Sequence, residues 1–127
     1  MSRTAQIAAV CGSRGATSAN RHLLDAFVAI AGARVSVVST PDVAEVPHFD
    51  PDRVDDPPVE VARWRAALDA ADAVVLAVPE YAASIPGTLK NALDWLVGSA
   101  TLYGKPVLVL TAGTTGGEHV RPAMVLT

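Results

Sequence analysis

Residues 73–95 read AVVLAVPEYAASIPGTLKNALDW, and this stretch decides the fold class of the chain. Its first six residues are apolar at every position, as is typical of a strand buried on both faces of a parallel sheet. Residues 79–86 contain two prolines and predict a braced loop. From about Gly87 to Val97, Leu89, Leu93 and Leu96 recur at helical spacing. The stretch therefore predicts one strand–loop–helix unit of an α/β protein.

The rest of the chain repeats this alternation of apolar runs and helical periods. Further strands are predicted at 6–10, 34–39 and 106–111, the last also buried, and further helices at 18–30 and 59–71. In the first of these helices, Leu23, Leu24, Phe27 and Ile30 recur at helical spacing. Residues 41–58 are acidic and rich in proline, which predicts an irregular connection. With right-handed crossovers this order gives a doubly wound sheet in a single domain over residues 1–127.

Composition and charge exclude several classes of protein. The 127 residues are 50% hydrophobic with a mean hydropathy of +0.32, which excludes disorder over most of the length. The formal net charge of −3 with scattered basic residues argues against a nucleic-acid partner. The single cysteine, Cys11, excludes an intrachain disulfide framework and a cysteine-based zinc site. No run reaches the roughly 18 apolar residues of a membrane helix. We expect a cytoplasmic protein without a metal site or a membrane partner.

Ligands of open parallel sheets bind beyond the carboxyl ends of the strands, and three loops of small and polar residues fall there. The first is residues 12–20, GSRGATSAN, before the first helix. Small residues let backbone amides converge at a helix N-terminus, which suits a phosphate group. The same pattern is equally consistent with a simple strand-to-helix turn capped by Ser18. The second loop is 79–86, and the third is the Gly/Thr segment 113–117.

The second loop and its helix carry a resemblance to a known family. Pro79-Glu80-Tyr81 followed by residues 84–95, SIPGTLKNALDW, closely resembles the signature of the NAD(P)H-dependent FMN reductases. This flavodoxin-like family includes chromate, quinone and azo-dye reductases. The resemblance implies a flavodoxin-like doubly wound parallel sheet with strand order 2-1-3-4. It also implies FMN as cofactor, NADPH or NADH as reductant, a small acceptor (flavin, quinone, chromate or azo compound) and a homodimer or homotetramer.

The resemblance also implies roles for particular residues. The FMN phosphate would be held at the first loop, one edge of the isoalloxazine ring would meet the second loop, and the pyrimidine edge would meet the third. No side chain is expected to act as acid or base, because the cofactor carries the hydride chemistry. The expected cofactor-binding residues are Ser13, Arg14, Thr17, Ser18 and Asn20 for the phosphate, Pro79, Glu80, Tyr81, Ala82 and Ala83 for one ring edge, and Gly113, Thr114, Gly116 and Gly117 for the other.

The chain departs from the family pattern in three places. Gly15 stands where the family usually has an arginine, and Ala82 stands where it usually has an asparagine. Residues 118–127 resemble only the start of the family's fourth helix, so the resemblance implies that the usual fifth strand is missing from this sequence. The strand at 106–111 would then have one unpaired edge.

Two other functions remain open from the sequence. An FMN electron carrier would bind the flavin without a nicotinamide site, but its ring is typically framed by bulky aromatics, and this chain has only 5% aromatic residues. A flavodoxin-like fragment without catalytic activity would keep the motifs and not the reaction. The visible spectrum of the protein, followed by its response to NAD(P)H, separates the three.

Overall fold

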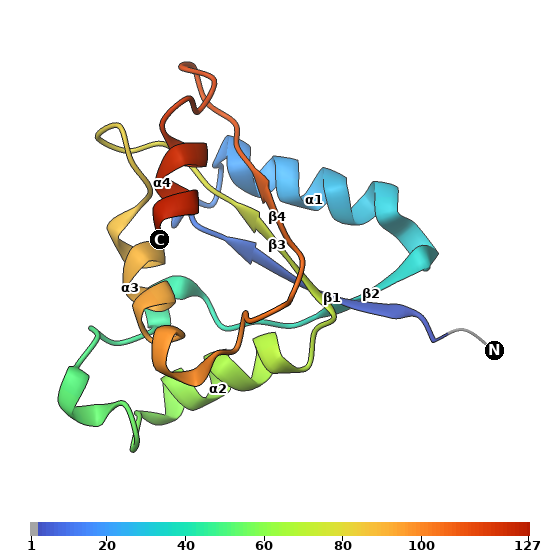
Figure 1. The fold of residues 1–127 in the computed structure, drawn as a ribbon. Helices are drawn as coiled ribbons and strands as arrows, with labels where there is room; N and C mark the ends of the chain where they lie inside the picture. Colours follow the sequence, from blue (N-terminus) through green and yellow to red (C-terminus); the bar gives the residue numbers. More distant parts are fainter. Residues whose placement is uncertain (1–2) are drawn as a thin grey trace.

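The computed structural model describes residues 3–127, and its centre is a parallel sheet of four strands. The strand order is β2-β1-β3-β4, as predicted (Figure 1). Ile7 lies opposite Ala73, and Val74 lies opposite Val107, which places the carboxyl ends of the central strands side by side. The strands are β1 (Ala5–Cys11), β2 (Val35–Val38), β3 (Ala73–Ala77) and β4 (Val107–Leu110).

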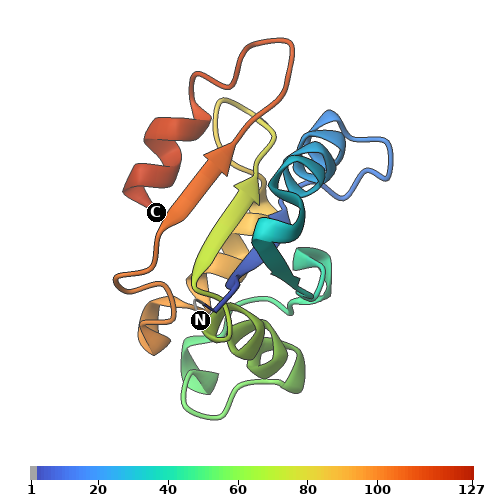
Figure 2. The ribbon, with the colours of Figure 1, turned by 90° about the vertical axis from the view of Figure 1, so that its right-hand side faces the viewer.

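Helices lie on both faces of the sheet, which is the doubly wound arrangement. Figure 1 shows α1 along one face and α2 and α3 along the other, and Figure 2 shows α4 beside β4. The helices are α1 (Ala19–Ala31), α2 (Val59–Asp69), α3 (Gly87–Asp94) and α4 (Val120–Leu126). This flavodoxin-like α/β arrangement confirms the predicted fold class.

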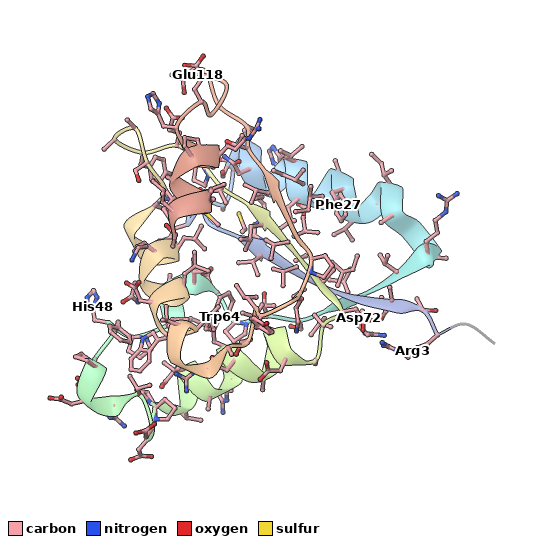
Figure 3. All side chains as sticks on the ribbon, in the orientation of Figure 1. Arg3, Phe27, His48, Trp64, Asp72 and Glu118 are labelled. Atoms are coloured by element: carbon pink, nitrogen blue, oxygen red, sulfur yellow. The ribbon has the colours of Figure 1, made fainter. Side chains whose placement is uncertain are left out.

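Alternate residues of β3 supply two separate cores, because successive side chains of a strand point to opposite faces. Val74 and Leu76 belong to the larger cluster, which includes Trp64 of α2 (Figure 3). Val75 and Ala77 pack on the other face with Leu24 of α1. These four strand residues are at most 2% exposed, so the prediction of a strand buried on both faces is confirmed.

Several side chains of residues 86–95, PGTLKNALDW, stabilise the fold. The Asn91 side chain accepts a hydrogen bond from Phe49 N–H at 2.8 Å and donates to the carbonyl oxygens of Val46 and Pro47. Trp95 is 1% exposed, and its indole N–H donates to Pro47 O at 2.8 Å. These bonds fasten the irregular connection 41–58, whose only regular pieces are two short 3₁₀ turns. Lys90 and Asp94 form the exposed ion pair typical of this helical spacing.

Two sequence predictions need correction, and one residue departs from its helical pattern. The strand β4 was expected to be buried, but Val107 is 41% and Leu108 is 44% exposed, because β4 is an edge strand of the described sheet. Ile30 shares the helical spacing of Leu24 and Phe27, but it is 86% exposed, because the core on that face of the sheet takes only those two residues from α1. The helix predicted to reach Val97 ends at Asp94, and a separate 3₁₀ turn follows at Val97–Ser99.

At the amino end of the sheet, Asp72 accepts hydrogen bonds from the Arg3 guanidinium and from Gln6 N–H (Figure 3). The Arg3 hydrogen bond and the Gln6 N–H hold the pKa of Asp72 below its ordinary value. No helix within residues 3–127 has the length and hydropathy to cross a membrane. In the same residues no group of three or more His, Cys, Asp or Glu side chains is placed to hold a metal ion.

Candidate functional site

Three loops meet beyond the carboxyl ends of β1, β3 and β4 and enclose a cleft of about 460 Å³. In Figure 1 they lie at the upper left of the sheet. The volume is in the range of about 300–1,000 Å³ that is usual for small-molecule sites. The cleft is lined by Ser18, Ala19, Asn20, Pro79, Glu80, Tyr81, Ala82, Ala83, Thr111, Ala112, Gly113, Thr114, Thr115 and Gly117.

The first wall of the cleft is the N-terminus of α1. Ser18 is the N-cap, and its hydroxyl accepts a hydrogen bond from Asn20 N–H at 3.2 Å, which confirms the predicted cap. The first turn of any helix leaves backbone N–H groups without intrahelical partners, and the helix dipole favours an anion there. The hydroxyl hydrogen of Ser18 remains able to donate. This end of the cleft therefore suits a phosphate group.

Three other residues that were expected to bind the phosphate, Ser13, Arg14 and Thr17, do not line the cleft. Ser13 is 3% exposed, and its hydroxyl accepts a hydrogen bond from Gly15 N–H at 3.3 Å. Arg14 and Thr17 are exposed and do not line the cleft. The Ser13 side chain thus shapes the loop, and Arg14 and Thr17 would have to move to reach a ligand.

Asn20 makes a contact that the sequence did not predict. It is 2% exposed, and its carboxamide donates from Nδ2 to Ala112 O and accepts at Oδ1 from Ala112 N–H, both at 2.9 Å. The partners are 92 residues apart in the sequence. The first and third loops are therefore joined by a pair of hydrogen bonds on the wall of the cleft.

The second wall is a tight hairpin at residues 81–84. Tyr81 and Ser84 exchange both backbone hydrogen bonds at 3.0 Å. The two residues between them, Ala82 and Ala83, have φ values of 50° and 56°. Such turns need two residues with positive φ and usually contain Asn or Gly, because a Cβ is unfavourable in this region. The loop thus holds strained backbone at the edge of the cleft.

Glu80 joins the second loop to the third. Its carboxylate accepts hydrogen bonds from His119 N–H at 2.9 Å and from the Thr115 hydroxyl at 3.3 Å, and His119 Nδ1 lies 3.2 Å from Oε1. The His119 backbone N–H is the largest cause that holds the pKa of Glu80 below its ordinary value; the His119 ring and the Thr115 hydroxyl add to it, and partial burial opposes it. The side chain of Glu80 is 12% exposed, so the carboxylate braces the wall and offers little charge to a ligand.

The third wall follows β4 and contains a close backbone approach. Gly117 has a φ of 69°, and a Cβ placed there would lie 2.5 Å from Thr111 Oγ1. The same hydroxyl is buried and has no hydrogen-bond partner among the described residues. Since buried polar groups are normally paired, this orphan on the lining of the cleft is consistent with a ligand that supplies the missing partner.

Ten of the fourteen residues expected at the cofactor lie together on this lining. Ser13, Arg14, Thr17 and Gly116 do not. The lining also contains four residues that the sequence did not predict as cofactor-binding, namely Ala19, Thr111, Ala112 and Thr115. The signals for the last three were the small and polar composition of residues 111–117 and the resemblance of this segment to a flavin-edge loop of the family.

A small polar cleft at the carboxyl edge of a flavodoxin-like sheet, with a helix N-terminus at one end, defines a nucleotide-type site of the doubly wound class. Residues 5–126 match the family described as NADPH-dependent FMN reductase. The chain belongs to this family, and the membership confirms the expected class, an NAD(P)H-dependent oxidoreductase with FMN as its cofactor.

Individual relatives agree with this family. The quinone reductase of Escherichia coli (strain K12) is 36% identical over 135 residues, which cover 98% of this chain and 72% of that protein. A probable NADPH:quinone oxidoreductase 2 of Oryza sativa subsp. japonica is 39% identical over 126 residues, which cover 91% of this chain and 62% of that protein. The flavoenzyme NAD(P)H:(acceptor) oxidoreductase FerB of Paracoccus denitrificans superposes with a TM-score of 0.83 at 28% identity, covering 94% of this chain and 68% of FerB.

Proposed function

We propose that the three-loop cleft binds FMN and that the protein uses NAD(P)H to reduce a quinone-type acceptor. One observation carries the assignment of the site: the cleft joins the N-terminus of α1, where an anion is favoured, to a wall that holds the unpaired Thr111 hydroxyl. The acceptor class follows from the relatives, two of which are named for quinones. When bound, FMN supplies the hydride chemistry.

The protein's own part is to bind and orient the cofactor. Ser18 and the backbone N–H groups at the start of α1 would hold the phosphate, with Arg14 and Thr17 able to approach from the surface. Backbone groups of residues 79–83 would meet one ring edge. Those of Gly113, Thr114 and Gly117 would meet the other, and Gly116, which lies outside the lining, would reach the ring only after a movement of the loop.

Three broader proposals accompany this function. The first is that the sequence 1–127 belongs to a single domain, which the continuous four-stranded sheet within residues 3–127 supports. The protein is a homo-oligomer, supported by the open edge of β4 with its exposed Val107 and Leu108. It works in the cytoplasm, supported by the use of one buried, unpaired cysteine.

The test is spectroscopic. The protein mixed with FMN and passed through a desalting column should retain the yellow flavin absorbance, which NADPH or NADH should bleach under anaerobic conditions. A benzoquinone should then restore the colour. Retained flavin that NAD(P)H does not bleach would indicate an electron carrier, and failure to retain flavin would indicate a fragment without activity; either result contradicts the proposal.

A further inference from the structure

Asn20 is expected from the family resemblance to bind the phosphate, yet its Oδ1 and one of the two hydrogens of Nδ2 are already bonded to Ala112. Nδ2 donates to Ala112 O and Oδ1 accepts from Ala112 N–H, each at 2.9 Å. The side chain is 2% exposed, so these two bonds are protected from water. An oxygen fixed toward the cleft wall is also a poor neighbour for an anion.

The partner residue explains why a carboxamide is needed. Ala112 lies two residues beyond the end of β4 at Leu110, whose carbonyl oxygen accepts from Val78 N–H at 2.8 Å. Beyond that point the backbone of Ala112 has no strand beside it that offers both a donor and an acceptor. An unpaired peptide group in this partly buried position is costly. A carboxamide presents a donor and an acceptor on two separate atoms, so it can meet the C=O and the N–H of one residue at once. A serine carries both functions on a single oxygen, an ionised Asp has no donor, and Leu has neither.

The bond pair also fixes two parts of the cleft relative to each other. Asn20 lies in the first turn of α1, beside the cap that would hold a phosphate, and Ala112 begins the loop that carries Gly113, Thr114 and Gly117. Glu80 holds the far side of that loop at Thr115 and His119. Asn20 therefore sets the distance between the phosphate end of the cleft and the wall that would face the ring.

We propose that Asn20 is a positioning residue, which acts on flavin through Ala112 and the loop 111–119 and makes no contact with the phosphate. The proposal rests on the proposed function. It differs from the role implied by the family resemblance, in which Asn20 holds the phosphate directly. The two roles predict different selectivity: a phosphate ligand favours FMN over riboflavin, whereas a residue that positions the ring wall affects both flavins alike.

The first arm of the test compares FMN and riboflavin binding by quenching of flavin fluorescence. Asn20→Ala should weaken both by about tenfold or more, since it removes two buried hydrogen bonds, and should leave the ratio of the two dissociation constants within about twofold of the original protein. Asn20→Asp puts a carboxylate oxygen opposite Ala112 O and a buried negative charge beside the phosphate end, so it should weaken both flavins, FMN more than riboflavin. The ratio of the two dissociation constants is therefore judged on Asn20→Ala, for which a loss confined to FMN would overturn the proposal and restore the phosphate role.

The second arm uses hydrogen–deuterium exchange of the protein without flavin. Asn20→Ala and Asn20→Asp should each speed exchange in residues 111–119, and unchanged exchange there would overturn the proposal. Asn91→Ala is the matched control, because Asn91 also pairs its carboxamide with distant backbone, at Phe49, Val46 and Pro47, away from the cleft. It should speed exchange in residues 46–49 and leave 111–119 and flavin binding unchanged. If the original protein binds neither flavin, the proposed function fails, and this exchange arm still decides the role of Asn20.

Discussion

Two of the hollows formed by the described residues have similar sizes and opposite chemistry, and their contrast shows which features mark a binding site. The larger, about 560 Å³, lies along β4 between α3 and α4, whereas the three-loop cleft measures about 460 Å³. The larger groove is walled mainly by aliphatic side chains. It is lined by Leu76, Leu93, Leu96, Val97, Ala100, Leu102, Tyr103, Val107, Val109, Arg121, Met124, Val125 and Thr127.

The cleft is smaller than the groove, yet it contains more polar groups in fixed directions. It has a capped helix N-terminus, an unpaired hydroxyl, strained backbone and three loops cross-linked by Asn20 and Glu80. The groove offers contact area and few polar groups that could orient a charged nucleotide. Size alone would select the wrong hollow, because specificity comes from a few placed polar groups. The following predictions test this contrast, from the largest expected effect to the smallest.

The most damaging single change to the cleft should be Gly117→Ala. The added Cβ would lie 2.5 Å from Thr111 Oγ1, and the φ of 69° is itself unfavourable for alanine by about 1–2 kcal/mol. We expect FMN affinity to fall by more than about tenfold. Gly104→Ala is the matched control, because Gly104 has a φ of 67° and open space around it, far from the cleft. Both variants should melt at lower temperature, measured by circular dichroism, and equal loss of FMN binding in both would speak against the cleft.

Ser18→Ala should distinguish the contribution of the phosphate end of the cleft to flavin binding from that of the ring end. A hydrogen bond to a charged group is worth about 1.5–3 kcal/mol, so FMN binding should weaken by more than about tenfold. Riboflavin, which has no phosphate, should lose much less. Lys90→Ala removes one member of the exposed Lys90–Asp94 pair and should leave both affinities nearly unchanged. Titration of both flavins checks this, and a larger loss for Lys90→Ala than for Ser18→Ala would reverse the placement of the site.

Low pH should weaken the hydrogen bonds that Glu80 accepts from Thr115 and His119. Because the folded protein holds the pKa of Glu80 below its ordinary value, the ionised carboxylate stabilises the closed loop above the unfolded pKa, and this contribution is lost as the pH falls through the folded pKa. Hydrogen exchange in residues 115–119, corrected for the intrinsic pH dependence, should therefore rise at acid pH. Glu80→Gln should raise it at neutral pH and remove the pH dependence. The expected cost to FMN affinity is only a few-fold, since a neutral amide can still accept from His119 N–H. A Glu80→Gln variant that keeps the original pH dependence would show that the brace is not the titrating group.

The smallest expected effect is an increase in stability. Ala83→Gly relieves a φ of 56°, and Ala100→Gly relieves a φ of 53° outside the cleft. Each should stabilise the fold by up to about 1 kcal/mol, which raises the melting temperature by a few degrees. Only Ala83→Gly should also change FMN affinity, because residues 79–83 form a wall of the cleft. A change in affinity for Ala100→Gly of the same size would remove the distinction between cleft and surroundings.

The regular elements could be predicted from the sequence because they depend on local pattern. The continuous apolar run at residues 73–78 is typical of a strand that is buried on both faces of a parallel sheet. A serine such as Ser18, directly before a segment of helical periodicity, is typical of a helix N-cap. The wrong predictions concern residues whose burial depends on neighbouring elements, because the local sequence pattern does not show which elements will pack beside them. Val107 and Leu108 have the same apolar character as β3, but β4 lies at the edge of the described sheet.

The candidate site was predicted in outline and not in detail. Its three loops follow from the rule that ligands bind at the carboxyl edge of parallel strands. The bonds that join them could not be predicted, since Asn20 and Ala112 are 92 residues apart and Glu80 and His119 are 39 apart. No periodicity relates such pairs, and only the packed structure shows that the Asn20 carboxamide is already occupied.

The central claim is that FMN binds in the small polar cleft and not in the larger apolar groove. The most direct test is hydrogen–deuterium exchange of the protein with and without saturating FMN. The account predicts slower exchange in residues 13–20, 79–84 and 111–117, with little change in 97–109 and 121–127. Protection confined to the residues along β4 and α4, or no protection in the three loops while FMN is bound, would contradict it.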